Sequence, residues 1–134
     1  MTASIGSLSP ALSAFLAERH LGTLVTLRPD GSPHAVPVGF TVGTGTGGVV
    51  VRVITSGASV KAANARRAGR AGVTQHEGRR WATLEGSVRV LHDEAAVASA
   101  VAAYAARYRE PKVRADRVVI EIEVDRIMCN SGLR

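Results

Sequence analysis

Residues 21–42, LGTLVTLRPDGSPHAVPVGFTV, decide the fold. Two runs rich in Val, Leu and Thr, residues 21–27 and 34–42, flank the segment RPDGS. Branched residues favour strands, whereas Pro, Asp and Gly favour a tight turn, so the stretch predicts an antiparallel hairpin. The sheet is therefore expected to grow by hairpins.

Four further stretches read as strands, and three read as helices. The strands are expected at residues 49–56, 71–76, 81–92 and 117–127, and the helices at residues 9–20, about 59–67, and 93–108. The strand–helix alternation of Rossmann folds is absent. An antiparallel sheet of six strands in 134 residues is expected to curl into a small barrel, since closure removes exposed edges. The sequence predicts a mainly β (α+β) fold in one domain, residues 1–134, with a structured core at about 9–127.

Single residues mark the ends and bends of these elements. Ser9 and Asp93 can cap helices, Pro10 suits a first helical turn, and Gly69 can end the middle helix. Gly86, inside a long strand, predicts a bulge or a barrel corner.

The chain carries a net charge of +6, which favours an anionic partner. The densest basic groups, ARRAGR (residues 65–70) and YREPKVRADR (residues 108–117), have no aromatic residues interleaved for stacking on bases, so we expect no nucleic-acid partner. No apolar run reaches 18 residues, and the opening MTASIGSLSP lacks the pattern of a signal peptide. A cytoplasmic protein without a membrane span is expected.

No motif for metal or covalent catalysis is present. The four histidines, at positions 20, 34, 76 and 92, are too far apart in sequence for a local ligand pair. Gly-x-Ser-x-Gly does not occur, and the lone Cys129 lies near the end of the sequence. No metal site is expected, and the catalytic residues stay unknown.

Two other features have a functional and a structural interpretation. Glu121 and Glu123 share one face of a strand, as acid–base groups do, but alternation with apolar residues is also what a solvated barrel exterior produces. Trp81 suits a core or interface anchor, and it also suits stacking on a flat ligand. The structural interpretation is favoured for both.

The stretch TSGASVKAAN, residues 55–64, follows a strand and opens a helix. Free backbone N–H groups and the dipole at a helix start attract anions, and Ser56, Ser59 and Lys61 add hydroxyls and a charge. It is not a Walker A loop. Local chemistry alone favours a plain Ser-capped helix with a solvated lysine over a phosphate site.

Five blocks of sequence, in this order, resemble a known family. They are SPHAVPVGFT (32–41), VVRVITSGASVKAANARRAG (50–69), GRRWATLEGSVRV (78–90), YAARYREP (104–111) and RVVIEIEVDRI (117–127). They are similar to the small split β-barrel proteins, of FMN-binding split-barrel type, in the flavin and deazaflavin oxidoreductase superfamily related to pyridoxamine 5'-phosphate oxidase. The strongest resemblance is to the branch that uses the deazaflavin coenzyme F420, in particular F420-dependent biliverdin reductases.

The resemblance implies a homodimer with cofactor sites between the subunits. It places the cofactor phosphate near five residues, which are Arg52, Thr55, Ser56, Ser59 and Lys61. The backbone of Val36, Pro37 and Val38 would border the deazaflavin ring. Asn64 would fix the helix start or touch the cofactor.

From the partner subunit, the resemblance implies contributions by Gln75, Arg80 and Trp81. A basic rim of Lys61, Arg66, Arg67 and Arg70 would suit the phosphodiester, carboxylate and glutamyl tail of F420.

The implied activity is hydride transfer from F420H2 to a conjugated small molecule, with biliverdin first. An FMN-dependent oxidoreductase of the same fold is the alternative, since the arginine-then-lysine phosphate pattern of FMN oxidases is not clear in this sequence. A non-catalytic protein that binds flavins or tetrapyrroles is the third interpretation.

Overall fold

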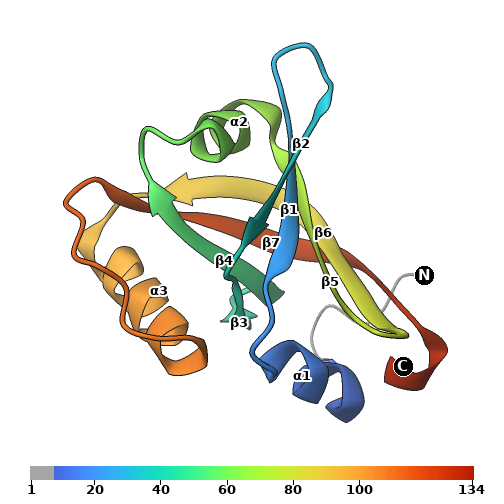
Figure 1. Cartoon of the computed structure of the whole chain (residues 1–134). Helices are drawn as coiled ribbons and strands as arrows, with labels where there is room; N and C mark the ends of the chain where they lie inside the picture. Colours follow the sequence, from blue (N-terminus) through green and yellow to red (C-terminus); the bar gives the residue numbers. More distant parts are fainter. Residues whose placement is uncertain (1–7) are drawn as a thin grey trace.

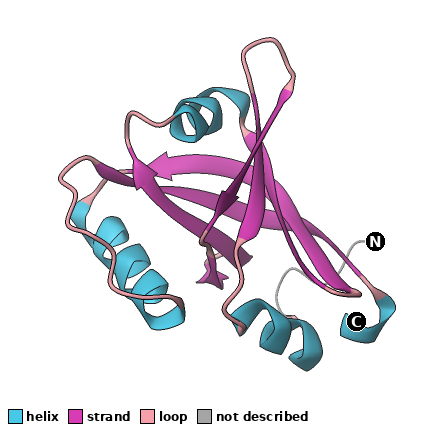
Figure 2. Cartoon of the chain, in the orientation of Figure 1, coloured by secondary structure: helices cyan, strands magenta, loops and turns pink. Residues whose placement is uncertain are grey.

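The computed structural model describes residues 8–134 as a curved antiparallel sheet with helices around it (Figures 1 and 2). The helices are α1 (Pro10–Ala17), α2 (Val60–Ala68), α3 (Glu94–Arg107) and a short 3-10 helix, η1 (Ser131–Leu133). The strands are β1 (Gly22–Leu27), β2 (Pro33–Val38), β3 (Thr41–Gly45), β4 (Gly48–Ser56), β5 (Arg70–Glu77), β6 (Arg80–Leu91) and β7 (Arg117–Cys129).

The strand order, β2-β1-β5-β6-β7-β4-β3, closes the sheet. β2 and β3 lie at opposite ends of that order, yet only Gly39 and Phe40 separate them along the chain. The two edges must therefore approach each other, which is the geometry of a split barrel. The prediction of a mainly β split barrel is confirmed, with one correction. Residues 34–42 form parts of two strands on opposite edges, so the sheet has seven strands rather than six.

The helix boundaries follow the signals in the sequence. The side chains of Ser9, Ser59 and Asp93 each accept a hydrogen bond from a backbone N–H in the first turn of α1, α2 and α3. Gly69 ends α2 with a φ of 78°, which a residue without Cβ adopts freely. The predicted caps and the predicted end of α2 are confirmed.

Gly86 bends β6, as predicted. The pairing of β6 with β7 shifts register between Glu85 and Gly86, which defines a bulge. A Cβ at Gly86 would lie 1.8 Å from the carbonyl oxygen of Glu123, so no other residue fits without moving the neighbouring strand. The glycine allows the sheet to curl at this point.

Glu121 corrects the expectation of a solvated face on β7. It lies opposite Arg52 of β4 and Arg89 of β6, and only 4% of its surface is exposed. Its carboxylate accepts hydrogen bonds from Arg52 Nε at 3.0 Å and from Arg89 Nη2 at 2.7 Å. Burial raises the pKa of Glu121, but these two arginines outweigh burial and hold it below its ordinary value. Glu123 is exposed, as expected.

None of the helices between residues 8 and 134 has the length and apolar character needed to cross a membrane.

Candidate functional site

A cavity of about 450 Å³ lies where β2 and β4 end, beside the start of α2 and against α3 and the loop that follows it. In Figure 1 the arrowhead of β4 lies between α2 and α3. Six of the predicted site residues line this cavity, namely Pro37, Val38, Thr55, Ser56, Ser59 and Lys61. Chain segments more than 60 residues apart in sequence thus meet at the predicted anion site.

The start of α2 presents hydrogen-bond donors to the cavity. Ser59 Oγ accepts from Thr55 Oγ1 at 3.1 Å and from the backbone N–H of Ala62 at 3.2 Å, so its own hydroxyl proton remains for an outside acceptor. Within residues 8–134, no hydrogen bond engages the backbone N–H groups of Val60 and Lys61. These donors point from a helix start, where the dipole also favours an anion.

Three cations, Lys61, Arg114 and Arg117, line the cavity, and no acidic residue does. No carboxylate in the described part of the chain forms an ion pair with Lys61. Arg114 lies 3.7 Å from Asp116, and Arg117 donates to the carbonyl of Lys112 at 2.7 Å. Sequence reasoning missed both arginines, although they belong to the basic group YREPKVRADR.

Asp116 holds the loop after α3 against the turn that precedes α2. Its carboxylate accepts a hydrogen bond from Ser56 Oγ, and its carbonyl accepts one from the backbone N–H of Gly57 at 2.7 Å. The Ser56 hydroxyl donates to Asp116, so it holds the loop in place and is not free to donate to a ligand. Arg114 and Arg117 flank Asp116 and are thereby positioned at the cavity.

Tyr104 of α3 forms the wall opposite β2, next to Gly39. Its ring lies 5.0 Å from the ring of Tyr108, centroid to centroid. The Tyr108 hydroxyl donates to the carbonyl of His20 at 2.7 Å and accepts from the backbone N–H of Phe40 at 3.2 Å. Tyr108 is thus fixed, and it supports Tyr104 from behind. Pro37 and Val38 give the cavity an apolar side suited to a flat ring.

Three predicted residues, one each from β4, α2 and β2, do not line the cavity. Arg52 pairs with Glu121, as described above. Asn64 is 2% exposed, donates to Thr26 Oγ1 at 3.1 Å and accepts from Arg67 at 2.9 Å. It joins α2 to β1, which corrects its expected contact with the cofactor or the helix start. Val36 is half-buried and packs against the core.

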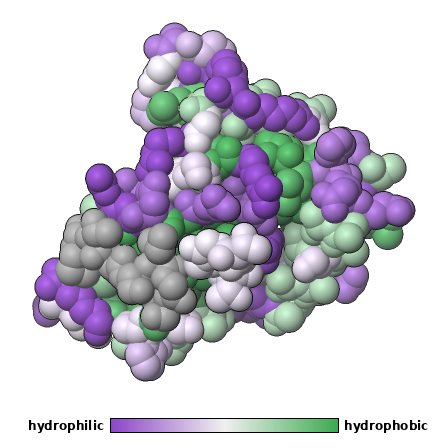
Figure 3. All heavy atoms as spheres, turned by 180° about the vertical axis from the view of Figure 1, so that it is seen from behind, coloured by the Kyte–Doolittle hydropathy of each residue, from purple (hydrophilic) through white to green (hydrophobic). Residues whose placement is uncertain are grey.

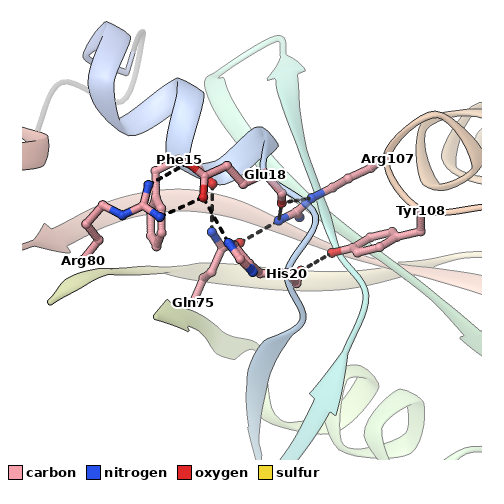
Figure 4. Close-up of polar contacts among 7 residues, drawn as sticks. All are labelled: Phe15, Glu18, His20, Gln75, Arg80, Arg107 and Tyr108. Atoms are coloured by element: carbon pink, nitrogen blue, oxygen red, sulfur yellow. Dashed lines mark hydrogen bonds and ion pairs between the residues drawn. The ribbon is translucent and has the colours of Figure 1, made fainter. Parts of the chain in front are cut away.

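Gln75 and Arg80, expected to reach a cofactor from the partner subunit, take part in contacts within the chain (Figure 4). Gln75 is fully buried, donates to the carbonyl of Phe15 at 2.9 Å and accepts from Arg107 at 2.6 Å. Arg80 forms two hydrogen bonds with Glu18, at 2.6 and 2.9 Å, and lies over the Phe15 ring. Gln75 is therefore a core residue, which corrects that expectation.

Trp81 remains at the surface, 39% exposed, at the start of β6. It is not a core anchor.

The expected basic rim has a different composition. Arg66, Arg67 and Arg70 do not line the cavity. Arg66 donates to the carbonyl of Gly57, in the turn before α2, at 3.0 Å. Arg70 forms two hydrogen bonds of 2.8 Å with Asp125, and Arg67 donates to the carbonyl of Leu27 at 2.7 Å. Arg114 and Arg117 take their place.

Within residues 8–134, no group of three or more His, Cys, Asp or Glu side chains is placed to hold a metal ion.

The family model of pyridoxamine 5'-phosphate oxidase matches residues 8–128. The chain belongs to this family. Among curated members, an F420H2-dependent biliverdin reductase of Mycobacterium tuberculosis is 48% identical over 126 residues, which is 94% of this chain and 90% of that protein.

Solved structures related to this pyridoxamine 5'-phosphate oxidase family member share its fold at low identity. A conserved hypothetical protein of M. tuberculosis, Rv2991, superposes with a TM-score of 0.75 at 23% identity, covering 96% of this chain and 88% of that one. A protein named F420 reductase superposes with a TM-score of 0.71 at 22% identity, covering 87% and 94% of the two chains. At these identities, the two structures support the fold alone.

Proposed function

We propose that this protein is an F420H2-dependent reductase and that biliverdin is its substrate. The observation that carries the proposal is the 48% identity, across nearly the whole chain, to an F420H2-dependent biliverdin reductase. The cavity supports it independently, because its donors and cations suit a long anionic cofactor.

The residues of the cavity fit the anionic arm of F420. The free N–H groups of Val60 and Lys61, the Ser59 hydroxyl and the Lys61 ammonium suit a phosphodiester. Arg114 and Arg117 extend the positive charge from this point along the loop after α3, where the carboxylates of the lactyl and glutamyl parts need partners. FMN ends in one phosphate and needs only the first of these groups. The extended charge favours F420 over FMN.

Bound F420H2 would supply a hydride from C5 of its deazaflavin ring. The chain's own contribution is to bind and orient. Lys61 and the start of α2 would hold the phosphate, and Pro37, Val38 and Tyr104 would confine the ring and exclude water from one side of it. Arginines near the cavity would hold anionic groups of the substrate. The proton that accompanies the hydride is assigned to no side chain.

We also propose that the protein acts as a homodimer and that the partner's surface completes the site. Leu27 and Trp81 are each 39% exposed, and Leu21 is 59% exposed. On the face seen in Figure 3, green hydrophobic side chains reach the surface among purple hydrophilic ones. Burial of such side chains against a second copy would stabilise a dimer. Of the three residues expected from the partner, Gln75 is buried and Arg80 is engaged by Glu18, whereas the exposed Trp81 side chain forms no hydrogen bond among residues 8–134.

Titration of the purified protein with F420, FMN and NADPH, followed by ligand fluorescence, tests the cofactor. Binding of F420 in the micromolar range is expected. Binding of FMN without F420 would overturn the proposal in favour of the FMN-dependent alternative. Turnover with F420H2 and biliverdin, followed by loss of biliverdin absorbance, tests the substrate. Binding of both ligands without turnover would instead support a non-catalytic tetrapyrrole-binding protein.

A further inference from the structure

A second cavity, of about 560 Å³, lies between α1, β3 and α3. It shares no lining residue with the cofactor cavity, which α3 borders through Tyr104. Its walls are mainly aliphatic, and they include Leu8, Leu16, Val42, Val49 and Ala103. A cavity of this size is within the range that holds small organic ligands.

One charged residue, Arg107, lines this cavity. Every hydrogen bond that its guanidinium donates within the described chain ends on a neutral oxygen. Figure 4 shows the bonds to Glu18 and Gln75. Nε and Nη2 donate to the carbonyl of Glu18 at 3.1 and 2.8 Å, Nη2 also donates to Gln75 Oε1 at 2.6 Å, and Nη1 donates to the carbonyl of Phe40. A guanidinium has five N–H donors, and four are used here. One N–H of Nη1 remains.

The positive charge of Arg107 is not neutralised within the chain. Glu18, whose backbone carbonyl accepts from Arg107, directs its carboxylate to Arg80 and His20 instead. The first seven residues, MTASIGS, contain no acidic side chain either. Burial lowers the pKa of Arg107 below its ordinary value, but an arginine remains protonated at neutral pH. The guanidinium lies over the rings of Phe40 and Tyr108, at 4.5 and 4.9 Å from their centroids, but no carboxylate among residues 8–134 pairs with it. Charges that are partly removed from water are normally paired with an opposite charge, and this one has none in the described chain.

We propose that this cavity binds an amphipathic monocarboxylate, a molecule with an aliphatic body and one carboxylate. The aliphatic walls would bury the body, and Arg107 would supply the missing ion pair through its free N–H. Ser13, Thr41 and Thr44 also line this cavity, and each carries a hydroxyl that can donate to the second carboxylate oxygen. Apolar burial and charge complementarity together select this ligand class over a neutral lipid or a cation.

Calorimetric titration of the full chain with sodium decanoate tests the proposal. Saturable binding of one decanoate per chain is expected, whereas decyltrimethylammonium, with the same tail and the opposite charge, should bind at least tenfold more weakly. Equal binding of the two probes, or no binding of decanoate, overturns the proposal.

Two variants test the location of the site, and a third tests the role of the charge. Ala103→Phe fills the cavity and should weaken decanoate binding at least tenfold, and Ala102→Phe, an exposed neighbour on the same helix that does not line the cavity, should leave it unchanged. F420 affinity should stay unchanged in both. Arg107→Met should weaken decanoate binding. The affinities of this variant for decanoate and for decyltrimethylammonium should therefore differ less than those of the wild type. Unchanged decanoate binding in Ala103→Phe refutes the location, even if Arg107→Met fails to fold. Gel filtration of Ala103→Phe tests whether a second copy of the chain occupies the cavity instead. If this variant changes its oligomeric state and the wild type does not bind decanoate, the cavity belongs to the contact between two copies and the proposal is overturned.

Discussion

Tyr104 occupies the space that a side chain at Gly39 would need. An added Cβ at Gly39 would lie 2.7 Å from Tyr104 Cε2 and 3.2 Å from Tyr108 Cε2. Both tyrosines are supported by each other and by the hydrogen bonds of Tyr108, so they cannot retreat freely. The absence of a side chain at Gly39 therefore sets the width of the proposed cofactor cavity.

Gly39→Ala is expected to displace Tyr104 and weaken F420 binding by about 1–2 kcal/mol, on the scale of a small overpacking change. Fluorescence titration measures the affinity, and circular dichroism checks that the fold is kept. Gly47→Ala is the matched control, since a Cβ there meets nothing within 4 Å. Equal affinity of the two variants would show that Tyr104 does not shape the site.

Lys61→Ala is expected to weaken F420 binding by roughly 1.5–3 kcal/mol, the scale of a charge-assisted hydrogen bond, and to leave the fold intact. Lys112→Ala removes the same charge from an exposed position that does not line the cavity. Its effect should be small. If both variants bind F420 as the wild type does, the anion lies elsewhere.

Glu121→Gln is expected to lower the free energy of unfolding by about 1–3 kcal/mol, because Arg52 and Arg89 lose their shared buried carboxylate. This loss is smaller than that for breaking a fully buried ion pair, because both arginines are partly exposed to water. Urea unfolding measures the change. Glu123→Gln, two residues along the same strand and exposed, should change stability by less than about 0.5 kcal/mol. Equal stability of the two variants would contradict this role for Glu121.

The Glu18 carboxylate is expected to make stability depend on pH in acid. Hydrogen bonds from Arg80 and then from His20 hold its pKa at about 2, below its ordinary 4.5. Since the folded-state pKa is lowered, the stabilisation is complete above pH 4.5 and is lost as the pH falls through about 2. The melting temperatures of the wild type and Glu18→Gln should therefore differ most near neutral pH and converge in acid. Glu110→Gln, an exposed carboxylate, should track the wild type at every pH. If the melting temperatures of the wild type and Glu18→Gln differ by the same amount at every pH, the Glu18 carboxylate does not make stability depend on pH.

Trp81 is the only tryptophan, so intrinsic fluorescence reports on one position. If the partner subunit's Trp81 borders the cofactor, saturating F420 should quench this emission, and dilution below the dimer dissociation constant should abolish the quenching. Free N-acetyltryptophanamide corrects for absorption by the cofactor. Unchanged emission at full occupancy of F420 would exclude Trp81 from the site.

Local signals in the sequence predicted local structure well. Ser9, Ser59 and Asp93 cap their helices because an N-cap needs only a side-chain oxygen and the next turn of backbone. Gly86 forms the predicted bulge for a similar reason, since the missing Cβ is a property of one position. The hairpin of residues 21–42 predicted the antiparallel character of the whole sheet.

Features that depend on distant partners were not predictable in the same way. Glu121 looks solvated in its strand pattern and is buried only because two arginines lie opposite it on neighbouring strands. The break at Gly39 and Phe40 exists because the barrel closes there. Arg114 belongs to an irregular loop, and it reaches the cavity because Asp116 bonds to Ser56, 60 residues away.

The position of β7 in the sheet has a consequence for synthesis of the chain. β7 comes after all other strands in sequence, but it lies between β6 and β4 in space. Until residues 117–129 have left the ribosome, β2-β1-β5-β6 and β4-β3 have no strand to join them, and each keeps an unpaired edge. The sheet can therefore be completed only after β7 has been synthesised. Rapid pairing of β7 with β6 and β4 then prevents these edges from pairing with other chains.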